Sequence, residues 1–382
     1  MNCLPHSGHC RCSVFHSAFA LGKEQRRESG FCLGAPRAPG RLPKEAVTIR
    51  PFLKISFGPK TGAASRSSRT GARICSLMTL AGIARLLQNS PSAARAIYRS
   101  RSGIPSEWFA NLSDEAWFWM NTTGRRRFSQ IATIVPGMPD AALQATYTGS
   151  SGDRTLLEAF NGYLLFKCHY ERHAGPLSKA RVLDFGCGWG RIIRFFLRDV
   201  PPENLAGLDY NAVALEACRA TNRWCRFTLI NPYPPTDLPA AEWDLIYLYS
   251  VFSHLPEEMH LALLREFHRL LHPGGLLIAT TRRREFIEEC KSLRDDPHLQ
   301  EKPDYISCGA EVFVDTDASL ATYDTGAYSY DLYPQKHGRS SFWGEACISR
   351  AYVERHWTDF DILEYIDDRQ VCPQNVIVAR KR

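Results

Sequence analysis

The sequence predicts an α/β protein whose central sheet is doubly wound and mostly parallel. Three observations lead to this prediction. Short apolar segments of strand type alternate with amphipathic helical segments from about residue 151 onward, which is typical of parallel sheets. A glycine-rich turn joins the first of these strands to its helix. Two late segments, 361–366 and 375–380, have the pattern of a hairpin.

The expected elements follow in chain order. A helix over 155–171 places Leu156, Phe160 and Leu164 on one stripe. Strands are expected at 181–185, 205–209, 226–230, 244–249 and 276–280. Helices are expected at 191–198, 212–220 and 256–271, after the first, second and fourth strands. Pro256 suits the first position of the last of these helices, and Glu257 complements the helix dipole.

The first 77 residues differ from the rest in charge. They hold 13 Lys or Arg and 3 Asp or Glu, whereas the whole chain holds 47 and 40, so the remainder has 34 basic and 37 acidic residues. The basicity therefore belongs to this segment, and we expect no nucleic-acid partner for the rest of the chain. Without apolar periodicity, 1–77 is expected to be a disordered basic extension. A targeting segment, an interaction tail and a start assigned too early, before Met78, remain open explanations.

Residues 78–150 are expected to form a helical cap or lid. Ser113 suits a helix N-cap, with Asp114 behind it. Trp108 and Trp117 belong to an unusually aromatic stretch, which either packs the cap onto the main domain or lines an acceptor pocket. The main domain is expected over 151–382, with an insertion at about 285–358 that is rich in tyrosine.

Cysteine usage and hydropathy exclude several classes of protein. The 13 cysteines are odd in number and scattered, which favours reduced thiols and a cytoplasmic protein over a disulfide framework. A short cluster of Cys and His at positions 3–12 matches no zinc module, so we expect no metal. No apolar run approaches the roughly 18 residues of a membrane span.

The glycine-rich turn runs from Asp184 to Arg191, with Gly186, Gly188 and Gly190 at alternate positions. Glycines at a strand-to-helix turn let the backbone approach a ligand closely, with the N-terminus of the next helix facing it. The dinucleotide fingerprint requires a glycine at position 191, where Arg191 stands. The turn instead resembles the D-x-G-x-G-x-G signature of class I S-adenosylmethionine (SAM)-dependent methyltransferases.

The resemblance assigns roles to the residues of this turn. It implies that Asp184 holds the loop and interacts with the amino-acid end of SAM, unless it is a simple turn residue. It also implies that Gly186, Cys187, Gly188 and Gly190 contact the cofactor.

The ends of the next two strands carry further candidate residues. Asp209 ends the second strand, where an acid at this distance from a glycine loop accepts hydrogen bonds from ribose hydroxyls. Tyr210 follows, and either lies on the adenine face or packs against the sheet edge. Asn231 ends the third strand, where the resemblance implies an acceptor for the adenine amino group. The family often has Asp there, but an amide oxygen also accepts.

A third block strengthens the resemblance. Residues 244–255 are similar to the family's fourth strand and following turn, and 272–275 to its turn into the fifth strand. His254 lies in this block. Its ordinary pKa near neutrality suits a base that takes a proton from a hydroxyl or amine during methyl transfer. The alternative is a histidine that orders the turn.

The resemblance covers roughly 143–382 and implies a seven-stranded sheet whose last strand is antiparallel. It implies SAM as cofactor, bound at the carboxyl ends of the first three strands. For the acceptor we expect a small molecule or a glycan, methylated at oxygen. Two alternatives stay open: an NAD- or nucleotide-sugar-dependent Rossmann enzyme, which Arg191 and the hairpin disfavour, and a methyltransferase-like binding protein without turnover.

Overall fold

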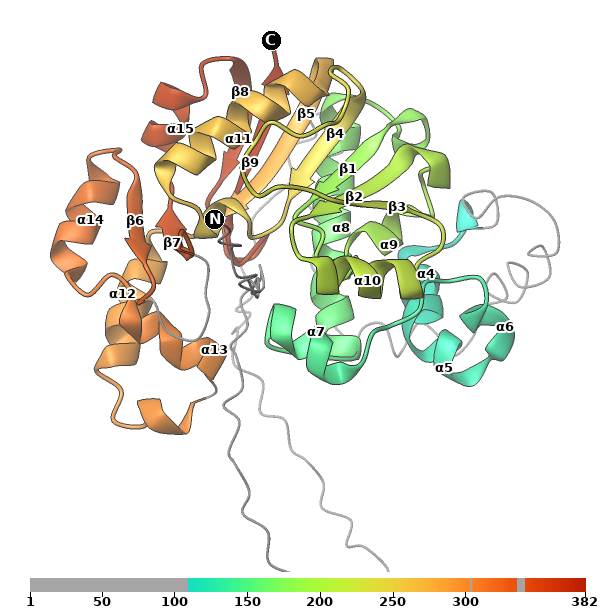
Figure 1. Cartoon of the computed structure of the whole chain (residues 1–382), viewed down its shortest axis with the longest axis horizontal. Coiled ribbons are helices and arrows are strands. Elements are labelled where there is room, and N and C mark those ends of the chain that lie inside the picture. Colours follow the sequence, from blue (N-terminus) through green and yellow to red (C-terminus); the bar gives the residue numbers. More distant parts are fainter. Residues whose placement is uncertain (1–108, 303, 335–340) are drawn as a thin grey trace, which may run out of the picture. The chain divides into compact units, whose positions relative to one another are not determined.

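The computed structural model describes residues 109–302, 304–334 and 341–382. Its centre is a seven-stranded sheet in the order β3-β2-β1-β4-β5-β9-β8 (Figure 1). The strand β9 is antiparallel to both β5 and β8, and the other pairings are parallel. The predicted doubly wound sheet with an antiparallel last strand is therefore confirmed. Its strands are β1 Val182–Phe185, β2 Leu205–Asp209, β3 Arg226–Leu229, β4 Trp243–Leu248, β5 Leu271–Thr281, β8 Phe360–Ile366 and β9 Asn375–Lys381.

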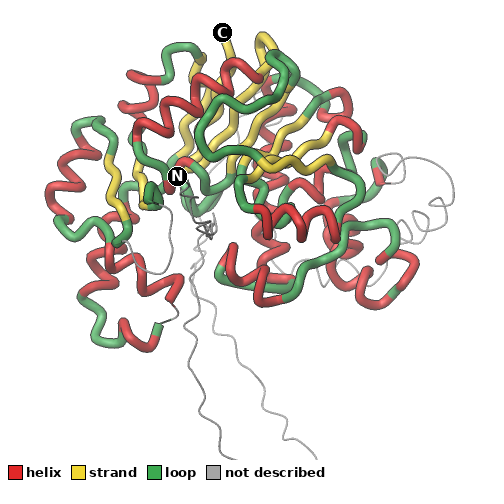
Figure 2. Tube along the Cα trace, in the orientation of Figure 1, coloured by secondary structure: helices red, strands yellow, loops and turns green. Residues whose placement is uncertain are grey.

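Helices cover both faces of this sheet (Figure 2). Four of them lie where helices were predicted: α8 Asp153–His173, α9 Ile193–Phe196, α10 Ala212–Thr221 and α11 Glu257–Leu270. A fifth, α15 Arg350–His356, was not predicted. The prediction of a helix over 191–198 was wrong in extent, since α9 has only four residues. The turn of the glycine loop continues to Ile192 because Gly190 has a φ of +75°, which is incompatible with a helix start there.

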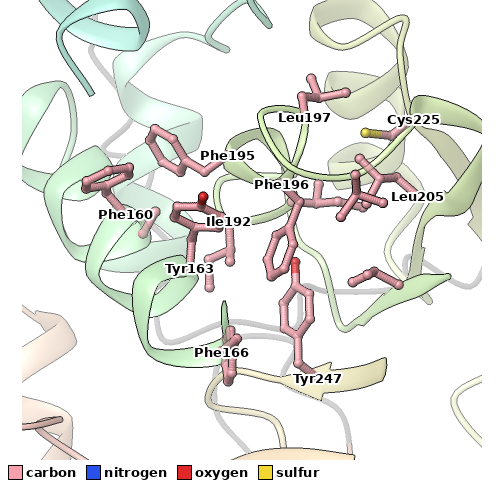
Figure 3. Close-up of a cluster of buried hydrophobic side chains, with 14 of the residues drawn as sticks. Phe160, Tyr163, Phe166, Ile192, Phe195, Phe196, Leu197, Leu205, Cys225 and Tyr247 are labelled. Atoms are coloured by element: carbon pink, nitrogen blue, oxygen red, sulfur yellow. The ribbon is translucent and has the colours of Figure 1, made fainter. Parts of the chain in front are cut away.

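Two hydrophobic cores lie on opposite sides of the sheet. Val182 belongs to one core and its neighbour Leu183 to the other, as the alternation of side chains along a strand requires. Figure 3 shows part of the first core, where Phe166 of α8 and Phe196 of α9 approach Tyr247 of β4. The ring centroids of both phenylalanines lie close to that of Tyr247, at 4.5 and 5.1 Å. These stacked rings fix α8 and α9 on this face of the sheet.

A helical cap adds to the first core. It contains α4 Asp114–Trp119, α5 Arg125–Arg127, α6 Ser129–Ala132 and α7 Ala141–Thr148, with a π-helix, η2, at Met120–Gly124. Ser113 caps α4 as expected, since its hydroxyl accepts a hydrogen bond from the Ala116 amide. Trp117 is fully buried, and its indole N–H donates to the Phe195 carbonyl at 3.0 Å. This tryptophan therefore packs the cap onto α9. The predicted extension 1–77, residues 78–108 with Trp108, and the Cys/His cluster lie outside the described residues.

The insertion between β5 and β8 adds to the second core. It holds α12 Glu285–Arg294, α13 Asp304–Ser307, α14 Thr316–Asp324 and a two-stranded antiparallel sheet of β6 Ser329–Leu332 and β7 Gly344–Cys347. This small sheet was not predicted. Several of the insertion's tyrosines serve packing: Tyr323 and Tyr333 are buried in the second core, and the Tyr328 hydroxyl donates to the Leu255 carbonyl.

Five 3₁₀ turns complete the described elements: η3 Leu177–Lys179, η4 Pro202–Asn204, η5 Phe252–His254, η6 Leu299–Glu301 and η7 Cys308–Glu311. The eight cysteines of the described part of the chain are all free thiols. None of the helices that the structure describes is long and apolar enough to cross a membrane.

Candidate active site

The glycine loop joins β1 to α9 at the carboxyl edge of the sheet. Gly186, Gly188 and Gly190 have φ values of +75°, +54° and +75°, a region that favours glycine. A Cβ atom on Gly186 would also lie 2.5 Å from the Val251 Cγ2 atom. The amides of residues 186 and 187 donate to the Leu208 carbonyl, which ties the loop to β2. Backbone conformation therefore favours glycine at all three positions, and at Gly186 the lack of space requires it as well.

Asp209 holds the same loop from the end of β2. Its side chain is 1% exposed, and its two oxygens accept hydrogen bonds from the Gly188 amide at 2.8 Å and the Asn211 amide at 2.9 Å. Burial raises the pKa of Asp209 to about 7. Each carboxylate oxygen has a further lone pair, so these contacts leave acceptor capacity for ligand hydroxyls.

Asp184 and Cys187 lie beside Asp209 in the buried part of the loop. Burial raises the pKa of Asp184 to about 7, and the negative charge of Asp209 adds to the rise. The Asp184 Oδ2 atom is buried and has no hydrogen-bond partner among the described residues. Cys187 is also buried, and the neighbouring Cys218 thiol donates to the Gly188 carbonyl at 3.1 Å. The structure thus brings the predicted loop residues and both acids together.

Tyr210 and Asn231 lie at the ends of β2 and β3, next to the insertion. The Asn231 Oδ1 atom accepts from the Tyr233 amide at 2.9 Å. Phe342 of the insertion lies edge-on to both tyrosines, with ring centroids 6.5 Å from Tyr210 and 5.8 Å from Tyr233. Tyr210 therefore borders an aromatic residue that sequence reasoning did not connect with it, and Asn231 is linked to that residue through Tyr233.

His254 ends η5 and is 1% exposed. Its ring stacks on Trp343 with a centroid distance of 4.1 Å. Its Nδ1 atom lies 3.0 Å from the Gly344 carbonyl, which can only accept, so Nδ1 carries the proton and Nε2 is free to accept one. Burial lowers the pKa of His254, although the nearby Glu345 carboxylate opposes the shift. The ring is therefore neutral at neutral pH, and His254 is not among the residues that line the cavity described below.

Ser250, which sequence reasoning left without a role, connects His254 to a cavity. It follows β4 with a φ of +60°, an uncommon value outside glycine. Its amide donates to the Thr280 hydroxyl at 2.8 Å, and its own hydroxyl accepts from the Gln374 side chain at 2.9 Å. The Ser250 Oγ atom lies 3.4 Å from His254 Nε2. These contacts hold a strained residue in place, as is common at functional sites.

The cavity beside Ser250, here called the Ser250 cavity, has a volume of about 330 Å³. Four arginines and three glutamates contribute to its wall. Its lining residues are Tyr147, Thr148, Glu158, Arg191, Tyr249, Ser250, Arg282, Arg283, Glu285, Phe286, Glu289, Arg369, Pro373 and Gln374. They come from the cap, α8, the glycine loop and the segments that follow β4, β5 and β8. The site thus combines a buried glycine loop with a charged cavity, and Arg191 of the loop and Ser250 both line that cavity.

Comparison with known proteins identifies one segment of this chain. Residues 182–275, which run from β1 into β5, match the family model of the methyltransferase domain. A curated relative, trans-aconitate 2-methyltransferase of Azoarcus sp. (strain BH72), is 34% identical over 106 residues, which are 27% of this chain and 39% of the relative. The chain thus matches about two fifths of that relative's length.

Solved structures of SAM-dependent methyltransferases are also similar. One from Methanosarcina mazei is 17% identical, with a TM-score of 0.36, over 53% of this chain and 93% of that chain. One from Mesorhizobium loti is 13% identical, with a TM-score of 0.37, over 56% and 96%.

The strand order and the matched segment define an α/β domain of the methyltransferase type. Residues 182–275 therefore carry a methyltransferase-domain sequence, in agreement with the resemblance of the glycine-rich turn to the class I SAM-dependent methyltransferases, a class whose cofactor is SAM.

Proposed function

We propose that this protein transfers the methyl group of SAM to an oxygen atom of a small molecule. The observation that carries the proposal is a polar cavity that Ser250 and Arg191 of the glycine loop line together. A volume of about 330 Å³ suits a small acceptor better than an extended glycan. The relative named above acts on trans-aconitate, a small carboxylic acid, which supports the same choice.

The cofactor is proposed to lie against the glycine loop and the ends of β1, β2 and β3. Gly186, Cys187, Gly188 and Gly190 would let the backbone approach it closely. The polar residues around the loop would contact different parts of the cofactor. Asp184 would bind its amino-acid end, Asp209 its ribose hydroxyls, and Tyr210 and Asn231 its adenine. The unpartnered Asp184 Oδ2 atom supports this assignment, because an ammonium group would supply the missing donor.

The proposed mechanism is an in-line displacement at the methyl carbon. The cofactor supplies a methyl group that is activated by a positive sulfur. The walls of the Ser250 cavity align the acceptor oxygen, which is the main contribution of the protein. The new O–C bond would replace the S–C bond of SAM, with S-adenosylhomocysteine as the leaving group. The acceptor proton would pass to the Ser250 hydroxyl, whose own proton would pass to His254 Nε2. Because His254 donates from Nδ1 to the Gly344 carbonyl, Nε2 is the nitrogen available for that proton.

Calorimetric titration tests the cofactor assignment and separates the alternatives. SAM and S-adenosylhomocysteine are expected to bind, and NAD is not. Binding of NAD alone would point to a dinucleotide-dependent enzyme. Tight SAM binding without turnover on any acceptor would point to a non-catalytic binding protein.

Replacement of Asp209 by alanine is expected to weaken SAM binding by about 1–3 kcal/mol. The change removes the proposed acceptor of the ribose hydroxyls and also releases the Gly188 amide that Asp209 holds. The measurement is the dissociation constant for SAM, with folding checked by thermal denaturation. Glu216→Ala, an exposed change on α10, is the control and should leave the affinity unaltered. Unchanged SAM affinity in a folded Asp209→Ala protein would remove Asp209 from the ribose site.

A further inference from the structure

The inner wall of the Ser250 cavity is cationic although the whole wall carries both charges. Arg191 is 7% exposed, and the side chain of Arg283 is 11% exposed. The side chains of Glu158, Glu285 and Glu289 are 41%, 43% and 45% exposed. The glutamates therefore lie toward solvent, where their charges are screened by water, while the two arginines lie deeper.

Arg283 has hydrogen-bonding capacity that the protein leaves unused. Its Nε atom lies 3.2 Å from Glu285 Oε2, and its Nη2 atom lies 2.7 Å from Asp367 Oδ1. Its Nη1 atom is buried and has no hydrogen-bond partner in the described part of the chain. A buried donor of this kind is costly unless a ligand or water supplies an acceptor. Arg191, which pairs with Glu158 at 3.1 Å, adds a second guanidinium to the same inner wall.

Gln374 provides an unused hydrogen-bond acceptor, in contrast to the unused donor of Arg283. It is 7% exposed, and its Nε2 atom donates to the Ser250 hydroxyl. Its Oε1 atom is buried and has no partner among the described residues. A ligand beside Gln374 therefore needs a donor, such as a hydroxyl group, at the position where Ser250 leads to His254.

We propose that the Ser250 cavity binds a small hydroxy carboxylic acid, with its carboxylate at Arg283 and Arg191 and its hydroxyl at Gln374 and Ser250. This inference rests on the proposed function, because the acid would be the methyl acceptor. A planar carboxylate matches the fork of a guanidinium, and the one proton of the hydroxyl can be donated either to the Gln374 oxygen or to the Ser250 hydroxyl beside it. Compounds with several phosphate groups fit less well, because the three glutamates at the cavity mouth would repel them.

The test is calorimetric titration of the protein saturated with S-adenosylhomocysteine. The probes are malate, citrate and 4-hydroxybenzoate, each compared with its neutral methyl ester, together with inorganic phosphate. At least one acid is expected to bind at least tenfold more tightly than its ester and than phosphate. The proposal is wrong if no acid binds more tightly than its ester, or if phosphate alone binds.

Neighbouring arginines provide a matched pair of variants. Arg283→Gln should weaken binding of the acid at least tenfold, because glutamine lacks the charged fork. Arg284→Gln is the control and should change it less than twofold, because Arg284 pairs with Glu288 and Asp324 and does not line the cavity. Equal effects of the two changes would overturn the proposal. Gln374→Met, which removes only the amide, should also weaken binding of the hydroxy acid and gives a second test if Arg283→Gln does not fold.

Binding of S-adenosylhomocysteine is measured separately for every variant. If it fails in the unaltered protein, the proposed function fails. If it succeeds while no acid binds, the class of methyltransferase stands and only the acceptor proposal is rejected.

Discussion

Replacing Glu345 by alanine is expected to lower the free energy of unfolding by about 3–5 kcal/mol, the usual cost of breaking a buried ion pair. Glu345 of β7 is 2% exposed and lies 2.6 Å from the Arg282 Nε atom and 3.1 Å from its Nη2 atom. It also accepts from the Tyr333 hydroxyl at 2.8 Å. Its loss would leave Arg282 without its counter-charge and the insertion without its polar link to the end of β5. Chemical denaturation measures the change.

The same pair predicts a pH dependence of stability. Burial alone would raise the pKa of Glu345, but the charge of Arg282 and the hydrogen bonds hold it below the usual value. The stabilisation is therefore complete above the ordinary glutamate pKa of about 4.3 and is lost as the pH falls through the lower, folded-state value. Glu345→Gln should lack this part of the loss of stability at acid pH.

The control for the Glu345→Ala prediction is Glu354→Ala, which removes an exposed pair with Arg350 and should lower the free energy of unfolding by less than about 1 kcal/mol. A Glu345→Ala protein no less stable than this control would contradict the prediction.

Replacing His254 by glutamine is expected to lower kcat by about 10²–10⁴-fold, the usual contribution of a general base. Glutamine can still donate to the Gly344 carbonyl and pack under Trp343, but it cannot take the proton that reaches Nε2. SAM affinity should stay nearly unchanged. The measurement is the steady-state rate with the acceptor that the titrations identify.

The pH profile distinguishes this role from a structural one. The unaltered enzyme should lose activity as the pH falls below the ordinary histidine value of about 6.5, because burial lowers the pKa of His254. The variant should lack this acid limb. His272→Gln, an exposed change near the start of β5, should leave both rate and profile intact. Near-normal turnover in His254→Gln, or loss of SAM binding together with activity, would return His254 to a role in ordering the turn.

Much of the sheet could be predicted from the sequence because its strands are short apolar runs with clear ends. The strand 205–209 was predicted at its observed bounds, and 181–185 and 226–230 within one residue. β5 is longer than predicted because it begins at Leu271, which pairs with Trp243 before a bulge. The pair β6 and β7 was missed because each has four residues and forms only through contact with the other.

Part of the candidate site could also be predicted from the sequence, and part of it could not. The residues of the glycine loop and Asp209 could be predicted from the sequence, because three alternating glycines in a turn and an acid at a strand end are local patterns. The Ser250 cavity could not be predicted, because Arg191, Arg283 and Gln374 are far apart in the chain and meet only in the fold. The burial of His254 also depends on distant residues, Trp343 and Gly344 of the insertion.

If the Ser250 cavity binds the acceptor, as we propose, its walls have a consequence for how acceptors change during evolution. Of its fourteen described lining residues, three, Arg191, Tyr249 and Ser250, lie within 182–275, the segment by which the family is recognised. The other eleven belong to the cap, α8, the insertion and the final hairpin. Selection for a new acceptor can therefore change the residues of those segments while residues 182–275, which match the family model, stay the same. Similarity within the matched segment therefore carries little information about substrate specificity. Two proteins that are alike in residues 182–275 can methylate unrelated compounds.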